Sequence, residues 1–289
     1  MKIACPAKIN LTLEVLDRRE DGYHALRSVM VPLDLADELT IEPAEHFAFA
    51  CSEQALDNAE NLAVRAVRAL ETAPAISIQL RKRIPSQAGL GGGSSDAAGV
   101  LRAAMAGAFG RSYAVDWLAI ARSLGSDVPF FLAESAALVE GTGERVTAAG
   151  ALPPWHVLLV KPPAGVSTAA AYAELDRRER PSRPRNASVS IAALTALQRG
   201  DFDGVEQLLG NDFHQVIAET TPPVARAIDA LHRAGARNAL LSGSGSAVFT
   251  LAHDRRTIDA IAERLDLDAN YLRFPTAFAA NRAWRGSVA

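Results

Sequence analysis

Apolar and polar positions alternate over much of the first forty residues, as expected of strands that bury one face. The alternation is clearest in three stretches, and a turn-rich segment at residues 18–23 separates the first two. Short alternating runs joined by turns are typical of an antiparallel sheet. We therefore predict strands at residues 7–16, 26–33 and 39–42.

A helical period begins at residue 61, where apolar residues recur every three or four positions. This segment has apolar side chains at positions 62, 63, 66, 67 and 70, and a short strand pattern follows it. Further along, an alanine-rich stretch places its larger apolar side chains on one stripe. The pattern predicts helices at 61–70, 95–109 and 115–124 and a strand at 76–80.

Two consecutive prolines, Pro153 and Pro154, indicate a domain boundary because proline breaks helices and central strands. We therefore divide the chain into two domains, residues 1–152 and 153–289. The second part alternates strand and helix patterns, which indicates an α+β fold. Its predicted strands are 156–160, 238–241, 247–251 and 271–274, and its predicted helices are 168–177, 191–198, 203–219, 223–233 and 257–265.

Composition narrows the partners that the chain can have. The net charge of −3 and the pI near 6.1 provide no basic footprint, so we expect no nucleic acid and no anionic membrane surface. Lys8 and Glu14 interrupt the N-terminus before an apolar region of signal-peptide length develops, and the longest uncharged run has 16 residues. We expect a cytoplasmic protein with reduced Cys5 and Cys51 and, from six scattered histidines, no protein-built metal site.

Residues 84–99 read IPSQAGLGGGSSDAAG and lead directly into a predicted helix. Glycines let the backbone approach a ligand, and the first N–H groups of a helix have no intrahelical partner, so this arrangement favours an anion such as phosphate. We predict that Ser94 and Ser95 cap the helix, with a hydroxyl that can also reach a phosphate oxygen or Mg²⁺. Asp96 is interpreted as a first-turn acid that suits the helix dipole.

The segment departs from the two most familiar nucleotide motifs. No lysine follows the glycines as a Walker motif requires, and Ser94 stands where G-x-G-x-x-G, counted from Gly89, needs its third glycine. A tight turn without a ligand is the alternative interpretation of the segment.

Five motifs, taken in order and spacing, resemble those of the GHMP kinases. They are PAKINLTLEV at 6–15, DGYH at 21–24, PSQAGLGGGSS at 85–95, GSDVPFF at 125–131 and LSGSGSAVF at 241–249. The resemblance covers nearly the whole chain. It implies an N-terminal domain like the second domain of ribosomal protein S5, a ferredoxin-like C-terminal domain, and an active site between them.

The pairing of PAKINL with DGYH is similar to the cytidine-recognising member of the family. This resemblance implies ATP and Mg²⁺ as cofactors and a cytidine diphosphate-linked methylerythritol as substrate, phosphorylated on its tertiary 2-hydroxyl in the non-mevalonate route to isoprenoid precursors. Kinases of mevalonate, phosphomevalonate or homoserine are the nearest alternatives. A catalytically silent nucleotide-binding or interaction protein is a further alternative, against which Lys8 and Asp127 argue.

The resemblance also implies residue roles. Lys8 would be the catalytic lysine beside the acceptor hydroxyl and Asp127 the candidate general base, since an ammonium keeps a carboxylate ionised and lowers the pKa of a hydroxyl. A surface lysine and a helix N-cap are the alternatives for these two residues. The ATP site would include Asn61 and Lys82 on the adenine side, with an N-cap and a surface charge as alternatives. The rest of it would be Pro85, Ser86, Gln87, Ala88, Gly89, Leu90, Gly91, Gly92, Gly93, Ser94 and Ser95.

On the substrate side, the resemblance implies Asn10 next to Lys8 and a cytosine site in the DGYH turn. The His24 imidazole would meet the polar edge of the base while the rings of Tyr23 and Tyr172 cover its face. Closure of a hairpin is the alternative role of Tyr23 and His24. Thr168 is a further expected contact, although GVST at 165–168 is about two residues shorter than the common family pattern.

Two other segments carry weaker expectations. The second glycine cluster, with Gly243 and Gly245, matches a family motif that packs beside the phosphate region, and a simple turn between strands is the alternative. Residues 177–188, RRERPSRPRNAS, are interpreted as a solvated loop, and an arm for phosphate or nucleic acid is the weaker alternative.

Overall fold

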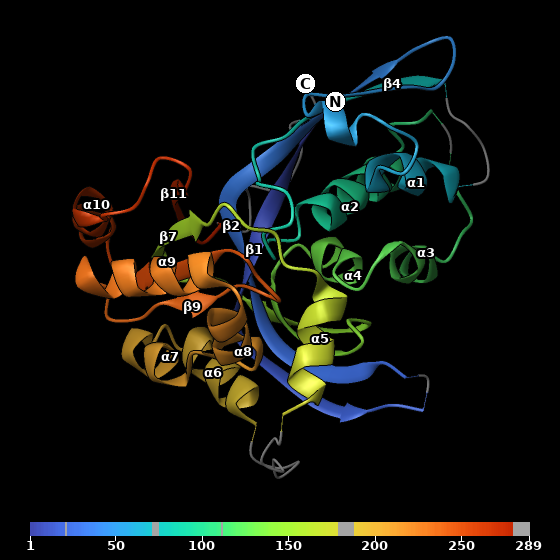
Figure 1. The fold of residues 1–289 in the computed structure, drawn as a ribbon. Coiled ribbons are helices and arrows are strands. Elements are labelled where there is room, and N and C mark those ends of the chain that lie inside the picture. Colours follow the sequence, from blue (N-terminus) through green and yellow to red (C-terminus); the bar gives the residue numbers. More distant parts are fainter. Residues whose placement is uncertain (21, 71–74, 111, 179–187, 280–289) are drawn as a thin grey trace.

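The structure is a computed structural model that describes residues 1–20, 22–70, 75–110, 112–178 and 188–279. Two long antiparallel strands, β1 (Lys2–Arg18) and β2 (His24–Pro43), run through the centre of the molecule (Figure 1). They belong to a sheet with the order β3-β4-β2-β1-β8, in which β5 also pairs with β2 and β6 pairs with β5. Its other strands are β3 (Ala48–Cys51), β4 (Ile76–Arg81), β5 (Ala136–Gly141), β6 (Arg145–Gly150) and β8 (Gly210–Asn211).

A second sheet has the order β11-β7-β10-β9, and its described pairings are antiparallel. Its strands all come from the second half of the chain: β7 (His156–Lys161), β9 (Leu240–Leu241), β10 (Val248–Ala252) and β11 (Leu272–Ala277).

The helices lie on both sides of the central strands, and we divide them into two groups by their order in the chain (Figure 1). One group comes from the first half of the chain: α1 (Leu62–Arg68), α2 (Gly92–Met105), α3 (Trp117–Leu124) and α4 (Val128–Leu132), after a 3₁₀ turn at Gln54–Leu56. The other group comes later in the chain: α5 (Thr168–Asp176), α6 (Val189–Gln198), α7 (Phe202–Leu208), α8 (Phe213–Thr220), α9 (Pro222–Arg233) and α10 (Arg255–Arg264).

Most predicted elements are present, and three predictions are wrong in detail. The two strands expected at 26–33 and 39–42 are one strand, β2, because its pairing passes from β1 and β5 to β4 without a break in the backbone. The helix expected at 203–219 is divided into α7 and α8 by β8, which pairs in parallel with β1. The alanine-rich helix begins at Gly92 and not at residue 95. Elements β3, β5, β6 and α4 had no predicted counterpart.

Buried apolar side chains connect the two halves of the chain. One hydrophobic cluster contains Ile9 and Val31 from the first sheet together with Trp155, Leu159 and Phe249 from the second half. An isolated bridge also pairs Leu33 with Phe278. Contacts of this kind fix the first sheet against the second, so residues before and after position 152 can contribute to one site.

Within the part of the chain that the structure describes, none of the helices combines the length and the apolar character needed to cross a bilayer. Most of the arginine-rich segment at 177–188, namely residues 179–187, lies outside the described residues.

Gly99 sets the distance between α2 and the central strands, and we predict that alanine there is destabilising. A Cβ atom at Gly99 would lie 2.6 Å from Cys5 Sγ and 2.8 Å from Leu39 Cδ1. Overpacking of this kind costs about 1–3 kcal/mol, whereas Gly→Ala at an open helical position stabilises by about 1 kcal/mol. Urea unfolding of Gly99→Ala should therefore show lower stability, partly recovered in the Cys5→Ala, Gly99→Ala double variant. A single variant as stable as the wild type would contradict this packing.

Candidate active site

Lys8 lies on β1 at an irregularity in the pairing with β2. The register shifts between Pro6 and Lys8, and Lys8 stands opposite Pro32, which has no N–H to donate. The backbone N–H of Lys8 donates outside the sheet, to Leu90 O in the glycine-rich segment at 2.9 Å. Bulges of this type aim a side chain away from the regular pleat and are frequent beside active sites.

The Lys8 ammonium is buried and has two polar neighbours. Its Nζ donates to Asn10 Oδ1 at 2.8 Å and lies 3.7 Å from Asp127 Oδ2. Burial lowers the pKa of Lys8, and the Asp127 carboxylate only partly opposes this effect. Asn10 is held in turn, because its Nδ2 donates to Ser28 Oγ at 2.8 Å. The lysine is therefore a confined cation and not a surface lysine, with only 4% of its side chain exposed.

Asp127 stands at the N-terminus of α4, yet its side chain makes no helix-capping hydrogen bond. The carboxylate is partly exposed and faces Lys8. The residues that follow it, Val128 and Pro129, are buried, which holds the backbone of Asp127 in place. Structure thus brings together the two residues that the sequence analysis assigned to catalysis.

The glycine loop, which we define as residues 85–91, is fixed by its carbonyl groups. Three consecutive carbonyl oxygens accept hydrogen bonds from β1 or from the turn before β10. The pairs are Ala88 O with Ala247 N (3.0 Å), Gly89 O with Ser242 Oγ (3.0 Å) and Leu90 O with Lys8 N (2.9 Å).

Gly91 is the N-cap of α2, with φ of +71°. A Cβ atom there would lie 2.9 Å from the Phe131 ring and 3.1 Å from Lys8 Cγ, so both conformation and space require glycine. Gly92 and Gly93 form the first helical turn, whose N–H groups have no intrahelical acceptor.

The prediction that Ser94 and Ser95 cap this helix is wrong, because the helix starts two residues earlier and both serines lie inside it. Ser94 Oγ is near Gly125, 3.7 Å from the place where a Cβ would stand. Ser95 Oγ is buried and has no hydrogen-bond partner within the described residues. A buried hydroxyl without a partner, close in the chain to the N-terminus of a helix, suits an anionic ligand.

Lys82 and Asp96 belong to a buried ionic triad with Asp37. Lys82 Nζ lies 2.5 Å from Asp37 Oδ2 and 2.7 Å from Asp96 Oδ2. Asp37 Oδ1 also accepts from the N–H groups of Arg83 and Ile84, at 2.5 and 2.9 Å. The alternative of Lys82 as a surface charge is excluded, because only 7% of its side chain is exposed. The interpretation of Asp96 as a first-turn acid is wrong, because α2 begins at Gly92 and Asp96 lies beyond its first turn, buried in this triad.

Two carboxylates share one ammonium in this triad, and the pKa of Asp96 is shifted as a result of its burial there. The pKa of Asp96 is raised to about 7, because burial and the neighbouring Asp37 carboxylate together outweigh Lys82, which lowers it. Burial alone would lower the pKa of Lys82, but Asp96 and Asp37 together raise it. Lys82 therefore stays charged while Asp96 titrates near neutrality.

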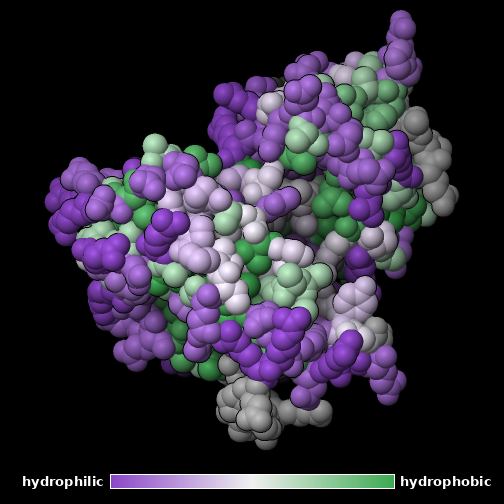
Figure 2. All heavy atoms as spheres, viewed as in Figure 1, coloured by the Kyte–Doolittle hydropathy of each residue, from purple (hydrophilic) through white to green (hydrophobic). Residues whose placement is uncertain are grey.

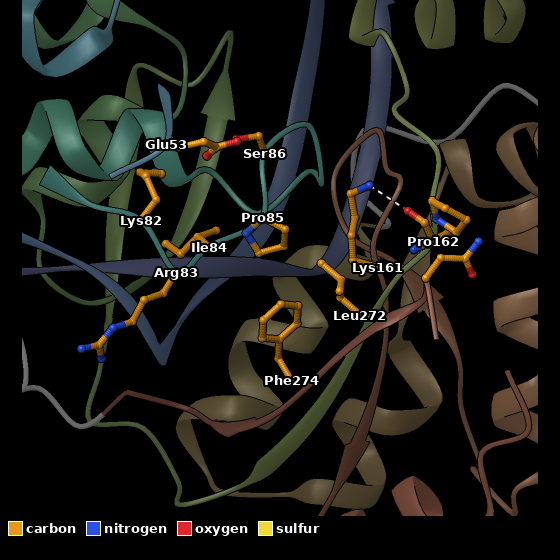
Figure 3. Close-up of a pocket in the computed structure, with 12 residues that line it drawn as sticks. Glu53, Lys82, Arg83, Ile84, Pro85, Ser86, Lys161, Pro162, Leu272 and Phe274 are labelled. Carbon is orange, nitrogen blue, oxygen red and sulfur yellow. Dashed lines mark hydrogen bonds between the residues drawn. The ribbon is translucent and has the colours of Figure 1, made fainter. Parts of the chain in front are cut away.

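A cavity of about 400 Å³ opens at the start of the glycine loop (Figure 3). Ser86 Oγ donates to Glu53 Oε2 at 3.1 Å across its rim, and the Lys161 ammonium points toward the carbonyl of Pro162. Both halves of the chain contribute to the lining: Glu53, Lys82, Arg83, Ile84, Pro85, Ser86, Lys161, Pro162, Pro163, Asn270, Leu272 and Phe274.

Asn61 and Gln87, two residues of the predicted ATP site, have different local contacts. Asn61 is the N-cap of α1, since its Oδ1 accepts from Ala63 N at 2.9 Å. Gln87 adopts a positive φ of +53°, and its side-chain oxygen lies against Gly165. The structure thus shows the capping role of Asn61, and its position on the adenine side stays a prediction.

His24 and Tyr172, two of the residues expected on the substrate side, meet near the start of β2. His24 is buried, and its Nε2 lies 2.9 Å from Asp176 Oδ1 on α5. The Tyr172 ring stacks on the imidazole with centroids 5.2 Å apart and also makes an edge contact with Phe213. Tyr23 is 69% exposed, so it presents most of its ring to solvent.

Thr168 lies apart from this aromatic group. Its hydroxyl is 2.9 Å from Ser244 Oγ, in the turn before β10. The two expected contacts on α5 thus face different neighbours, since Tyr172 joins His24 and Thr168 joins the second glycine cluster. Figure 2 shows a hollow between the two lobes of the molecule, bordered by pale and green residues of intermediate and hydrophobic character.

Within the described ranges, no three His, Cys, Asp or Glu side chains are grouped so that they could hold a metal ion.

Comparison with known proteins agrees with this geometry. Residues 61–135 match the family described as GHMP kinases N terminal domain, and residues 193–270 match the one described as GHMP kinases C terminal. The two matches together cover more than half of the chain. The chain belongs to the GHMP kinase family. It has the two-domain α+β fold of these kinases, and membership implies the use of ATP.

Several individual GHMP kinases are similar to this chain over almost its whole length. The chain is 42% identical to the 4-diphosphocytidyl-2-C-methyl-D-erythritol kinase of Symbiobacterium thermophilum, over 92% of this chain and 95% of that one. A crystal structure of 4-(cytidine 5'-diphospho)-2C-methyl-D-erythritol kinase superimposes with a TM-score of 0.76 at 36% identity, covering 97% and 100% of the two chains. Mevalonate kinase from L. major shares the fold alone, with a TM-score of 0.67 at 15% identity over 97% and 96% of the chains.

The sequence analysis missed Asp37, Asp176 and Asn211, which contact predicted site residues or the turn beside them. Asp37 holds Lys82, and Asp176 holds His24. Asn211 donates to the carbonyl oxygens of Leu241 and Gly243. Nothing in the local sequence around Asp37, which reads LDLADEL at residues 33–39, indicates its partner.

We predict that Asp96 makes stability depend on pH. Its pKa is about 7 in the folded chain against 3.8 for an ordinary aspartate, so between these values the folded state binds more protons than the unfolded state. Stability must then fall as pH rises through this window and level off above it. Relative to Asp96→Asn, the wild type should lose stability between about pH 4 and pH 7 in urea titrations. A difference that stays constant with pH would contradict the raised pKa.

Proposed function

We propose that this GHMP kinase transfers the γ-phosphoryl group of ATP to the 2-hydroxyl of 4-diphosphocytidyl-2-C-methyl-D-erythritol, in the non-mevalonate pathway to isoprenoid precursors. The observation that carries the proposal is the Lys8–Asp127 pair, 3.7 Å apart, at the side of a glycine loop that ends in a helix N-terminus. Relatives at about 40% identity with the corresponding name support the choice of acceptor.

Three features favour triphosphate binding at the start of α2. The loop carbonyls are engaged elsewhere, the first-turn N–H groups lack intrahelical acceptors, and Ser95 Oγ is buried without a partner in the described part of the chain. The nucleoside of ATP would lie toward the cavity lined by Lys82, Pro85 and Ser86, with Asn61 nearby on α1.

Mg²⁺ belongs to the same proposal. When bound, it would neutralise charge on the β- and γ-phosphates. The Ser95 hydroxyl is the ligand that this chain offers, since its oxygen is otherwise unpaired among the described residues. Asp37 and Asp96 both form ion pairs with Lys82, so the proposal does not use them as Mg²⁺ ligands.

At the acceptor, Lys8 and Asp127 would act on one hydroxyl. The acceptor oxygen forms a bond to the γ-phosphorus while the bond to the bridging oxygen breaks and ADP leaves; Asp127 takes up the hydroxyl proton. Lys8 would orient the hydroxyl and favour its ionised form. Asn10 and Ser28 would keep the ammonium in position through the hydrogen bonds described above. Alignment and charge stabilisation would supply most of the rate.

His24 would read the cytosine edge within this proposal. Because Asp176 lies against Nε2, the base would meet Nδ1 of the imidazole. Tyr172 already covers one face of His24, and the ring of Tyr23, which is 69% exposed, would cover a face of the base. Thr168 lies beside Ser244, so in this proposal it would lie nearer to the phosphate groups than to the cytosine base.

The proposal includes the division into domains 1–152 and 153–289, with the site between them. It is supported by the start of the second sheet at His156. A cytoplasmic location is also part of the proposal, and the free thiols of Cys5 and Cys51 support it.

An acceptor panel tests the proposed function. ATP consumption should be high with the cytidine diphosphate-linked substrate and near background with mevalonate, phosphomevalonate and homoserine. The uridine analogue should have kcat/KM lower by roughly tenfold to a hundredfold, because its N3 and O4 reverse the donor and acceptor of cytosine at a cost of about 1–3 kcal/mol. Turnover of mevalonate in place of the cytidine substrate would overturn the proposal.

Substitutions at the paired residues test the mechanism. Asp127→Asn should fold normally and lose roughly 10²–10⁴ in kcat, the usual range for an acid–base group. Lys8→Ala should also depress kcat more than the affinity for ATP, whereas Lys2→Ala, at an exposed lysine on the same strand, should behave as the wild type. Asp127→Asn with activity within threefold of the wild type would remove this residue from the mechanism.

A further inference from the structure

The turn that joins β9 to β10, residues 242–247, lies directly on the glycine loop. Ser242 Oγ donates to Gly89 O at 3.0 Å, and Ala247 N donates to Ala88 O at 3.0 Å. Two of the three engaged carbonyls of the loop therefore depend on this turn. Any shift of the turn must move the loop or break these hydrogen bonds.

Contact between turn and loop is close enough to exclude side chains. A Cβ atom on Gly89 would overlap the carbonyl oxygen of Ser242. A Cβ atom on Gly243 would lie 3.1 Å from Gly89 O and 3.2 Å from Lys8 Nζ. The turn thus has the loop on one side and the Lys8 ammonium on another, and its position affects both.

Asn211 holds the beginning of this turn. Its Nδ2 donates to Leu241 O at 2.7 Å and to Gly243 O at 2.8 Å, which uses both amide protons. Its Oδ1 accepts from Phe213 N at 2.9 Å. From the following helix, α8, His214 Nδ1 accepts from Leu241 N at 3.3 Å. The side chain of Asn211 therefore spans from β9 across Ser242 to Gly243.

Asn211 is itself fixed to the central sheet. It lies on β8, where it stands opposite Leu13 of β1, the strand that carries Lys8. The backbone N–H of the next residue, Asp212, donates to Leu13 O at 3.0 Å. A connection therefore runs from β1 through β8 and the Asn211 amide to the turn and then to the glycine loop.

We propose that Asn211 is a positioning residue for the glycine loop, acting through the turn at residues 242–247. This inference rests on the proposed function, in which that loop holds the triphosphate of ATP. Only an amide satisfies the site, because two carbonyl oxygens require two donors on one side chain and Phe213 N requires an acceptor. Aspartate has the same shape but would place its charge against both carbonyl oxygens.

Asn211→Asp and Asn211→Ala test the proposal. With the loop less firmly supported, KM for ATP should rise roughly fivefold or more, while KM for the cytidine substrate stays within about twofold. Loss of folded protein alone lowers apparent kcat and cannot raise one KM selectively. Two variants are used so that poor folding of one does not decide the outcome, and thermal unfolding measures the folded state of each.

Asn238→Asp is the matched control. Asn238 is also half-buried and clamps backbone near β9 and β10, since its Oδ1 accepts from Leu251 N at 2.8 Å and its Nδ2 donates to Glu206 at 2.7 Å. It has none of the hydrogen bonds that connect Asn211 to the turn. Its substitution should lower the unfolding temperature and leave KM for ATP unchanged. An equal effect of both substitutions on KM for ATP would overturn the positioning role.

Direct titration with a non-hydrolysable ATP analogue separates this inference from the choice of acceptor. The dissociation constant should rise in both Asn211 variants by the same factor as KM. If the wild type binds the analogue tightly but does not phosphorylate the cytidine substrate, the proposed acceptor is wrong. The effect of the Asn211 substitutions on analogue binding still tests the role of Asn211 in that case. Equal dissociation constants for the wild type and both Asn211 variants would overturn the role of Asn211.

Discussion

The site depends on a hydrogen-bonding constraint in the glycine loop. Ala88, Gly89 and Leu90 each use their carbonyl oxygen to accept a bond from another element, so the loop is tied to β1 and to the turn before β10. With the carbonyls committed, the N–H groups at the start of α2 remain for an anion. Gly91 completes the arrangement, since a side chain there would collide with Phe131. Glycine is required by packing here as much as by flexibility.

Lys82 and Lys8 are both largely buried cations, but nearby carboxylates compensate their charges to different extents. The structural role of Lys82 and the proposed chemical role of Lys8 follow from this difference. Lys82 lies between two carboxylates, so its pKa is raised and its charge serves to hold β2, β4 and α2 together. Lys8 has an amide oxygen at 2.8 Å and a single carboxylate at 3.7 Å, and burial lowers its pKa. A cation with incomplete compensation favours a further negative partner, which a developing alkoxide or phosphoryl oxygen can supply.

The site is assembled from segments that lie far apart in the chain. β1 brings Lys8, α2 brings the helix N-terminus, α4 brings Asp127, and the turn at residues 242–247 supports the loop from the second half. The shared hydrophobic cluster around Trp155 and Phe249 keeps the two sheets in contact, which makes this convergence possible. Apolar packing between the halves therefore has a direct role in the geometry of the proposed phosphoryl transfer.

Local sequence by itself determined those features whose causes are local. The alternation around Lys8, the helical period after the glycines and the turn residues near position 20 predicted strands, a helix and a hairpin because each depends on neighbours in the chain. Tertiary structure alone decided the helix start at Gly92, the continuity of β2, the triad of Lys82 with Asp37 and Asp96, and the hold of Asn211 on its turn. These depend on partners that only folding brings near, as with Lys82 and Asp37, 45 residues apart. Sheet pairing and packing determine which side chains meet when they are this far apart in the chain. The residue pattern of a single segment carries no information on that pairing.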